Sequence, residues 1–88
     1  MEDKNWIELH GKTKAILDRN ANYILILFND VSMGKLVVTV PKSCILYHTL
    51  KRNEYYNLFV ELKGVTHVNN GRIFTNNILL VRKAVNKL

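Results

Sequence analysis

The sequence predicts one all-β domain of five strands, with a short helix or connector between the third and fourth strands. Apolar and polar residues alternate from Trp6 to Leu17, which is the period-two pattern of a strand with one buried face. Four more strand-like segments follow, separated by turn residues such as Asn, Gly and Pro. A chain of 88 residues suits one domain, residues 1–88, with one core and no need of disulfides.

The first two strands are joined by a polar turn. From Trp6 to Leu17 the odd positions are apolar or small and are expected to face the core, which leaves Lys12 and Lys14 outside. Residues 18–22 contain Asp, Arg and Asn, and Asp and Asn side chains accept local backbone hydrogen bonds in turns. The next strand, Tyr23 to Asn29, is apolar on both faces, which indicates a central position or a strongly curved sheet.

The third strand is expected from Lys35 to Val40, after a turn in which Gly34 can adopt a positive φ. Its inward residues are Leu36, Val38 and Val40. Pro41 ends the strand because it lacks the amide proton that the ladder needs.

Residues 42–55 have two interpretations. Apolar residues recur at helical spacing after Ser43, which is a candidate N-cap, so a helix of two turns fits. An irregular connector fits equally well.

The fourth strand is expected from Tyr56 to Val65. Its alternation sends Leu58, Val60 and Leu62 inward and leaves Phe59 facing outward. Gly64, near the end of this strand, is a candidate site for a bulge or bend.

A hairpin turn is predicted between the last two strands. The expected loop, residues 65–72, contains Asn70-Gly71, and Asn-Gly is favoured in the two-residue turns that match strand twist. Ile73 to Lys83 supplies the fifth strand, and residues 84–88 form a basic tail that is expected to fray.

The order of these elements resembles the oligonucleotide/oligosaccharide-binding (OB) fold, from Trp6 to about Val85. The resemblance rests on a long first strand interrupted by Gly11, a helical segment after the third strand, and the approach Leu50-Lys51-Arg52-Asn53-Glu54-Tyr55 to the fourth. An SH3-like small barrel is the competing fold. In that fold the helical turn lies between the last strands, so a helix candidate after strand three favours the OB-like barrel. The resemblance implies a ligand across strands two and three, flanked by the loops joining strands one–two and four–five.

Charge points to an anionic partner. The chain has 13 Lys and Arg against 7 Asp and Glu, a net charge of +6, which favours nucleic acid, an acidic protein or an anionic membrane. The only cysteine, Cys44, excludes an intramolecular disulfide and a cysteine-based metal cluster. The longest apolar run is too short to cross a bilayer, and no secretory signal is visible. We therefore expect a cytoplasmic protein with no membrane partner.

Binding of single-stranded nucleic acid needs cations for phosphates and exposed rings for bases. The loops and outward positions of the predicted barrel offer both kinds of side chain. The candidate nucleic-acid-binding residues are Lys12, Lys14, Arg19, Tyr23, Lys35, Phe59, Lys63, Arg72 and Phe74. Phe59 is the strongest ring candidate because its neighbours Leu58 and Val60 belong to the core. The alternative interpretation is that the lysines form an ordinary solvated face and that the rings pack in the core or at a protein interface.

Catalysis has no support in the sequence. The three histidines lack metal-ligand spacing, and the glycines form no phosphate-binding loop. Cys44 and His48 stand four residues apart, yet no third group is available to orient them as a nucleophile and base. We expect no enzymatic activity, no cofactor and no metal.

These observations predict a module that binds single-stranded nucleic acid, with DNA preferred over RNA, as an accessory factor in replication, recombination or repair. A replication or recombination enzyme is a second candidate partner. The alternative is a protein-interaction subunit that docks onto a larger enzyme through outward apolar residues such as Val37, Phe59 and Val81, without touching nucleic acid. The oligomeric state does not follow from the sequence.

Overall fold

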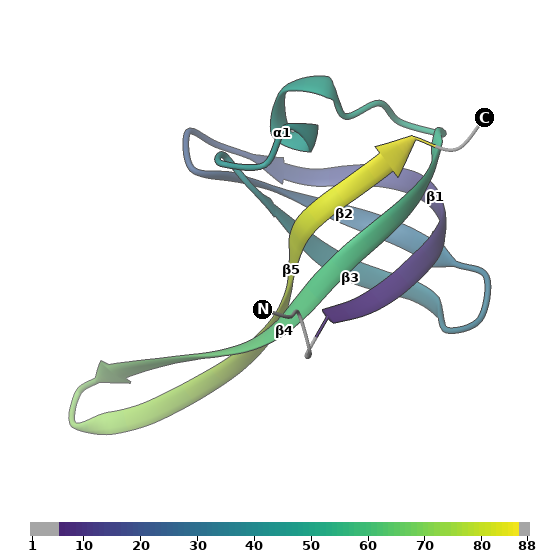
Figure 1. Cartoon of the computed structure of the whole chain (residues 1–88). Coiled ribbons are helices and arrows are strands. Elements are labelled where there is room, and N and C mark those ends of the chain that lie inside the picture. The colour runs from purple at the N-terminus through teal and green to yellow at the C-terminus, as the bar shows by residue number, and fades with distance from the viewer. Residues whose placement is uncertain (1–5, 87–88) are drawn as a thin grey trace.

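Five strands close into a barrel in the computed structural model, which describes residues 6–86 (Figure 1). The elements are β1 (Trp6–Arg19), β2 (Tyr23–Asp30), β3 (Gly34–Pro41), α1 (Leu46–Thr49), β4 (Tyr55–Asn69) and β5 (Arg72–Asn86). Around the barrel the strand order is β1-β2-β3-β5-β4, and β4 pairs back onto β1. The predicted all-β, OB-like barrel with a short helix between the third and fourth strands is therefore confirmed.

Four of the five ladders are antiparallel, and the fifth closes the barrel. That closure is parallel and consists of one residue pair, Thr39 with Leu80. Before Leu80, β5 runs with β4 outside the barrel, so β3 meets only the second half of β5 (Figure 1).

The core fills the barrel interior with the residues expected from the alternation in β2, β3 and β4. Val38, Val40, Leu58 and Val60 are completely buried, as predicted. Leu36 is only partly buried but packs against this cluster. The full set of buried apolar residues is Leu9, Ile24, Ile26, Phe28, Val38, Val40, Cys44, Leu46, Tyr56, Leu58, Val60 and Val81.

The prediction for Leu62 is wrong: its side chain is 55% exposed. Leu62 continues the inward alternation of Leu58 and Val60, but β4 leaves the barrel at this point. The alternation assigns Leu62 to the correct face of β4, but no layer of side chains packs against that face here to bury it.

The inward face of β1 also departs from the odd-position pattern. Two register shifts in the β1–β2 ladder, at Lys14 and Leu17, each insert an extra residue into β1. Leu9 and Thr13 are buried as predicted, but after the first bulge Ile16 packs against the core and Leu17 is exposed. A bulge reverses which positions face inward, which is why a simple alternation fails beyond Thr13.

Gly11 is required by the close approach of β1 and β2. A Cβ atom at this position would lie 1.9 Å from the backbone oxygen of Asn29. No side chain fits there without moving the backbone of β2.

The β2–β3 turn is fastened by Asp30, whose side chain is almost fully buried. Its Oδ1 accepts a hydrogen bond from the His10 amide, and its Oδ2 accepts bonds from the amides of Ser32 and Met33. Burial alone would raise the pKa of this carboxyl, but these backbone donors and the nearby His10 outweigh it. The pKa of Asp30 therefore lies below its ordinary value.

The segment between β3 and β4 contains a single helical turn. The helix α1 begins after Ile45 and has no side-chain N-cap, so the prediction of Ser43 as a cap is wrong. Between the two interpretations of residues 42–55, the structure has one turn of helix within an otherwise irregular connector. Among the described residues there is no helix long and apolar enough to cross a membrane.

A β-hairpin arm, residues 62–79, projects from the barrel (Figure 1). Asn70 and Gly71 both have positive φ, 53° and 76°, which confirms the predicted two-residue turn. The expected loop at residues 65–72 is instead paired strand up to the turn, because no proline interrupts the ladder. Of the bulge or bend expected at Gly64, the bulge is absent, because Gly64 pairs regularly with Asn77. The register shift of this ladder lies between Phe59 and Val60.

The chain end also differs from the expectation. Residues 84–86 belong to β5 rather than to a frayed tail, because Ala84 and Val85 pair with Leu58 and Asn57 of β4. Residues 87–88, the rest of the predicted tail, lie outside the described residues.

Candidate nucleic-acid interface

The ladders assign the predicted site residues to faces of the sheet. Residues directly opposite each other in neighbouring strands lie on the same face, and the faces alternate along each strand. By this rule the outward positions of β4 and their partners on β1 and β5 form one surface from the barrel to the arm tip, named here the outer strip. Its members include Trp6, Glu8, His10, Lys12, Tyr55, Asn57, Phe59, Glu61, Lys63, Val65, His67, Asn69, Arg72, Phe74, Asn76, Ile78 and Lys83.

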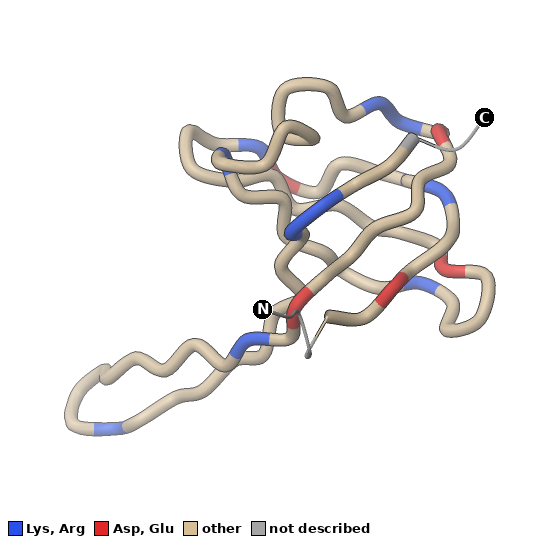
Figure 2. The backbone as a smooth tube through the Cα atoms, viewed as in Figure 1, with Lys and Arg blue, Asp and Glu red and all other residues tan. Residues whose placement is uncertain are grey.

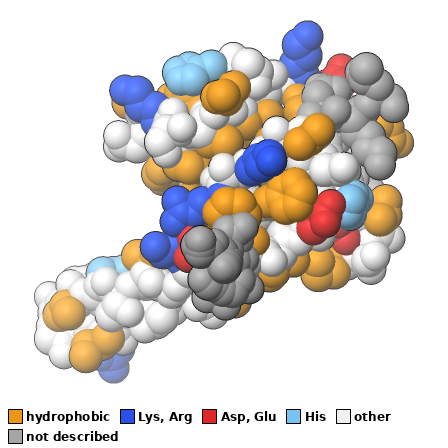
Figure 3. All heavy atoms as spheres, viewed as in Figure 1, with side chains coloured by type: hydrophobic (Ala, Val, Ile, Leu, Met, Phe, Trp, Pro, Cys, Tyr) orange, Lys and Arg blue, Asp and Glu red, His pale blue; other side chains and the backbone are white. Residues whose placement is uncertain are grey.

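The barrel half of the outer strip combines rings with cations. The ammonium of Lys12 lies 5.4 Å from the centroid of the Tyr55 ring, and that of Lys83 lies 5.9 Å from the centroid of Phe59. Phe59 is only partly buried, so the prediction that it faces outward is confirmed. Figure 3 looks onto this face, where hydrophobic, basic and acidic side chains gather over β1, β4 and β5.

The two acidic residues of the strip have local partners. Arg82 Nε donates to Oε1 of Glu61 at 2.8 Å, and Arg82 Nη2 lies 2.6 Å from the same oxygen. Oε2 of Glu8 lies 3.1 Å from Nε2 of His10, whose Nδ1 is 2.8 Å from Oδ1 of Asn57. These contacts direct both carboxylates toward neighbouring side chains.

The arm half of the outer strip has cations at its base and tip and rings between them. Lys63 lies at the base, opposite Ile78, and Arg72 lies next to the turn, opposite Asn69. The rings of His67 and Phe74 stack with centroids 6.0 Å apart and an angle of 28° between their planes. Residues 62–79 contain no Asp or Glu, so the charged positions of the arm in Figure 2 are all basic.

Most of the remaining candidates lie on a second surface, the outer face of β2 and β3 with the adjoining part of β1. Arg19 is the exception: it pairs with the buried Ile24 and is exposed at the end of β1. Tyr23 pairs with Pro41 at one end of this surface, near Arg19, and Lys35 pairs with Asn29 at the other. Lys14 is exposed at the first β1 bulge. The middle is apolar, with Leu25 and Leu27 on β2 and Val37, 52% exposed, on β3.

The structure therefore brings together five of the nine predicted residues and separates four. Lys12, Phe59, Lys63, Arg72 and Phe74 share the outer strip, whereas Lys14, Arg19, Tyr23 and Lys35 surround the apolar β2–β3 face. Lys12 is at the border, because its other neighbour is Asn29 of β2. Val81, the third residue of the predicted docking patch, is completely buried in the core and belongs to neither surface.

The nine residues selected from the sequence did not include Lys83, Tyr55 or His67. Lys83 reaches Phe59 only because of the irregular pairing next to Val60, and nothing in the local sequence marks that register. His67 and Phe74 stand opposite each other across a turn whose position Asn70-Gly71 defines. Counting outward from that turn would have paired the two rings.

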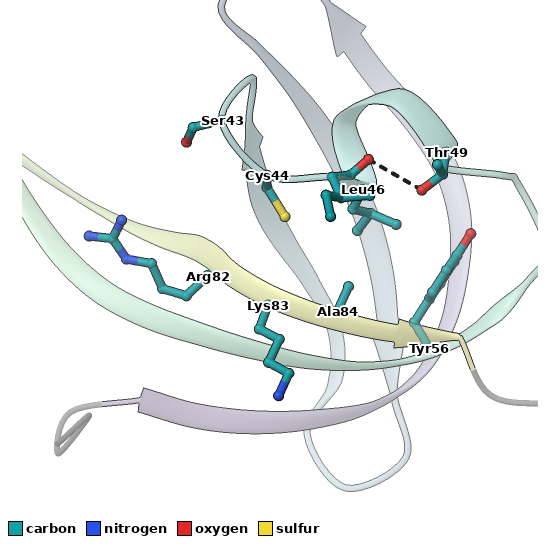
Figure 4. A pocket seen from close by; sticks show the side chains of 9 residues that line it. Ser43, Cys44, Leu46, Thr49, Tyr56, Arg82, Lys83 and Ala84 are labelled. Atoms are coloured by element: carbon teal, nitrogen blue, oxygen red, sulfur yellow. Dashed lines mark hydrogen bonds between the residues drawn. The ribbon is translucent and has the colours of Figure 1, made fainter. Parts of the chain in front are cut away.

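A groove of about 580 Å³ lies between α1 and the second half of β5 (Figure 4). Its lining is mainly apolar and includes Cys44, Leu46, Tyr56 and Ala84. Cys44 is buried whereas His48 is exposed and does not line the groove, so the two do not form a nucleophile and base here. Within residues 6–86 no group of three His, Cys, Asp or Glu side chains is arranged to hold a metal ion.

Comparison with known proteins yields no relative. No family model, no curated protein and no solved structure matches this chain. Residue geometry and charge are therefore the grounds on which a function is assigned.

Proposed function

We propose that this chain binds single-stranded nucleic acid along the outer strip, with DNA as the first candidate. The observation that carries the proposal is the alternation of cations and rings over one continuous face. From the barrel to the arm tip, Lys12 with Tyr55, Lys83 with Phe59, Lys63, the His67–Phe74 stack and Arg72 follow one another. The cations can neutralise backbone phosphates, and the exposed rings can stack with unpaired bases.

For a strand to bind at the barrel half, Lys12 and Lys83 must give up their contacts with the rings of Tyr55 and Phe59 and contact phosphates instead. A cation over a ring at an exposed site is worth about 0.5–1 kcal/mol, whereas a base stacked on an aromatic side chain is worth about 1–3 kcal/mol. The exchange is therefore favourable: each ammonium moves to the backbone, and the ring face that it covered takes a base.

The resemblance to OB domains implies a ligand on β2 and β3, but the outer strip is the better supported surface. The β2–β3 face has one exposed ring, Tyr23, and its cations stand at its ends around an apolar middle. We assign Arg19, Tyr23 and Lys35 at most a secondary contact with the strand. A module of this kind suits an accessory role in replication, recombination or repair.

The salt dependence of binding tests the proposal. If Lys12, Lys63, Arg72 and Lys83 each contact a phosphate, the log–log slope of affinity against salt on single strands is about −3. Arg72→Gln should reduce the magnitude of that slope by about 0.7. Arg52→Gln, the same change of charge in the connector after α1, is the matched control and should leave the slope nearly unchanged.

A second candidate function is supported by the apolar middle of the β2–β3 face. Leu27, which is half-buried, pairs with the exposed Val37, and this apolar row suits docking onto another protein more than contact with phosphates. Failure to bind oligonucleotides at low ionic strength, or binding insensitive to salt, would contradict the nucleic-acid proposal and favour this protein-interaction subunit.

A further inference from the structure

The two faces of the arm differ in chemistry. All charges and rings of residues 62–79 lie on the outer strip, and the opposite face, named here the inner arm face, carries none. The inner arm face consists of four cross-strand rows: Leu62 with Leu79, Gly64 with Asn77, Thr66 with Thr75, and Val68 with Ile73. Apolar rows stand at both ends, and small or polar rows stand between them.

The tip row is open to solvent, whereas the base row is open at Leu62 and half-buried at Leu79, which packs against the core. Val68 is 67% exposed and Ile73 71% exposed at the tip, and Leu62 is exposed at the base. The side chains at the centre of the face are smaller than those at its ends, because Gly64 has none. The hydroxyls of Thr66 and Thr75 lie 3.3 Å apart and contact each other. An isolated two-stranded ribbon is only marginally stable in water, so this face gains from being covered.

The order of the rows is self-complementary. If two arms stack face to face in antiparallel orientation about a two-fold axis, the tip row of each lies on the base row of the other. Val68 and Ile73 then meet Leu62 and Leu79, and the two central rows meet each other. An isologous interface requires such a match of one patch with itself.

We propose that the inner arm face packs against the inner arm face of a second copy of this chain. The lack of charge on this face permits a second copy as its occupant. Each copy has a net charge of +6, so most of its surface repels another copy, but this face brings no charged side chain into the contact. In the same arrangement the outer strips of both copies point away from the contact and stay open to nucleic acid.

The inner arm face is small, so we expect two free copies of the chain to associate only weakly through it. Four rows on two strands cover a footprint of roughly 200 Å², given strand spacings of about 4.8 Å and a rise of about 3.3 Å per residue. A standard stable interface buries about 800 Å² per partner. Two copies held on one strand have a far higher effective concentration, so the contact should produce cooperative binding. This consequence, unlike the contact itself, rests on the proposed function.

The cooperativity experiment uses oligo(dT) of two lengths, one that holds a single copy and one that holds two. We expect the second copy to bind the longer strand at least roughly tenfold more tightly than independent sites allow. Ile73→Thr should abolish this gain and leave the affinity for the short strand unchanged. Val31→Thr, an apolar-to-Thr change at an exposed position of the β2–β3 turn, outside both the outer strip and the inner arm face, is the matched control and should retain the gain.

A cross-linking experiment tests the contact without nucleic acid. In a Cys44→Ala background, Leu62→Cys and Val68→Cys stand at opposite ends of the arm part of β4, too far apart for a disulfide within one chain. In the antiparallel pair each faces the other across the contact, so oxidation of concentrated protein should give a covalent dimer. The pair Val65→Cys and Asn76→Cys, which is directly opposed on the outer strip, should bridge within the chain instead.

The outcomes separate the two proposals. Normal strand binding with equal cooperativity in wild type and Ile73→Thr, and no interchain disulfide, overturns the self-association contact and leaves the proposed function standing. Coverage of this face by a different protein would give the same result. An interchain disulfide without any binding to oligo(dT) overturns the nucleic-acid proposal and supports the contact.

Discussion

The two halves of the β4–β5 hairpin have the same backbone pairing but different surroundings. In the barrel half, Leu58 and Val60 are completely buried under the opposing strands, whereas in the arm half Leu62 and Val68 continue the same alternation into solvent. The barrel half is held by a core, and the arm half by its ladder and its turn. Substitutions of buried barrel residues should therefore change the free energy of unfolding, and substitutions in the arm should mainly change binding.

The largest expected effect is at Gly11 in the barrel wall. Gly11→Ala places a Cβ atom 1.9 Å from the backbone oxygen of Asn29, so β1 and β2 must separate, and we expect a loss of about 3 kcal/mol or more in chemical denaturation. The control is Gly64→Ala in the arm, where the new Cβ has its nearest neighbour at 3.7 Å and the effect should stay within about 0.5 kcal/mol. Equal losses at the two glycines would contradict the difference between wall and arm.

Two valines on the same face of β4 give the most direct comparison. Val60→Ala removes completely buried methyl groups and should lower the free energy of unfolding by about 2 kcal/mol. Val68→Ala makes the same change at an exposed arm position and should cost less than about 1 kcal/mol, mainly through β-propensity. A large loss at Val68 in dilute protein would mean that the arm is part of the folded core.

Neighbouring arm residues on opposite faces should differ in binding. Phe74→Ala removes a stacking ring from the outer strip and should weaken binding to a short single strand by about 1–3 kcal/mol, with little change in the salt slope. Ile73→Ala, one residue away on the inner arm face, should leave that affinity unchanged. The measurement is a fluorescence titration with an oligonucleotide that holds one copy, after circular dichroism has established that both variants fold.

The smallest effect distinguishes the two turns. Because the pKa of Asp30 is lower in the folded protein than in the unfolded chain, Asp30 stabilises the fold above its unfolded pKa of about 3.9. That stability is lost as the pH falls through the lower, folded pKa. Asp30→Asn should cost about 1 kcal/mol at neutral pH and remove this part of the acid dependence, as measured by denaturation at several pH values. Asn70→Asp at the arm turn, which carries no comparable cap, should add no such dependence.

The fold was predictable where periodicity alone determines which side chains are buried. β2, β3 and the first half of β4 follow their alternation, and Asn70-Gly71 marks the turn correctly. The bulges at Lys14 and Leu17 were not predictable, because a bulge depends on strand pairing and has no residue signature in β1. Only the outer part of the arm, residues 65–72, is expected as a loop, because its Asn and Gly residues are typical of a connector when the pairing is unknown.

The candidate site was predictable by residue type and not by arrangement. Nine cations and rings were selected, and membership of one face depended on register: Lys12 meets Tyr55, and Phe59 meets Lys83, through pairings between distant segments. The resemblance to OB domains directed attention to β2 and β3, where the exposed residues between the cations are apolar. Local sequence cannot reveal which of two outer faces collects the charges.

The closure of the barrel through the pair Thr39 and Leu80 has a consequence for the order of folding. The β4–β5 hairpin joins residues that are close in the sequence, and hairpins form within about 1–10 μs. The parallel contact joins residues far apart in the chain, so its loop-closure entropy delays it. We therefore expect β5 to fold onto β4 before it meets β3. The amides around this seam should exchange with solvent earlier than those of the hairpin beside it.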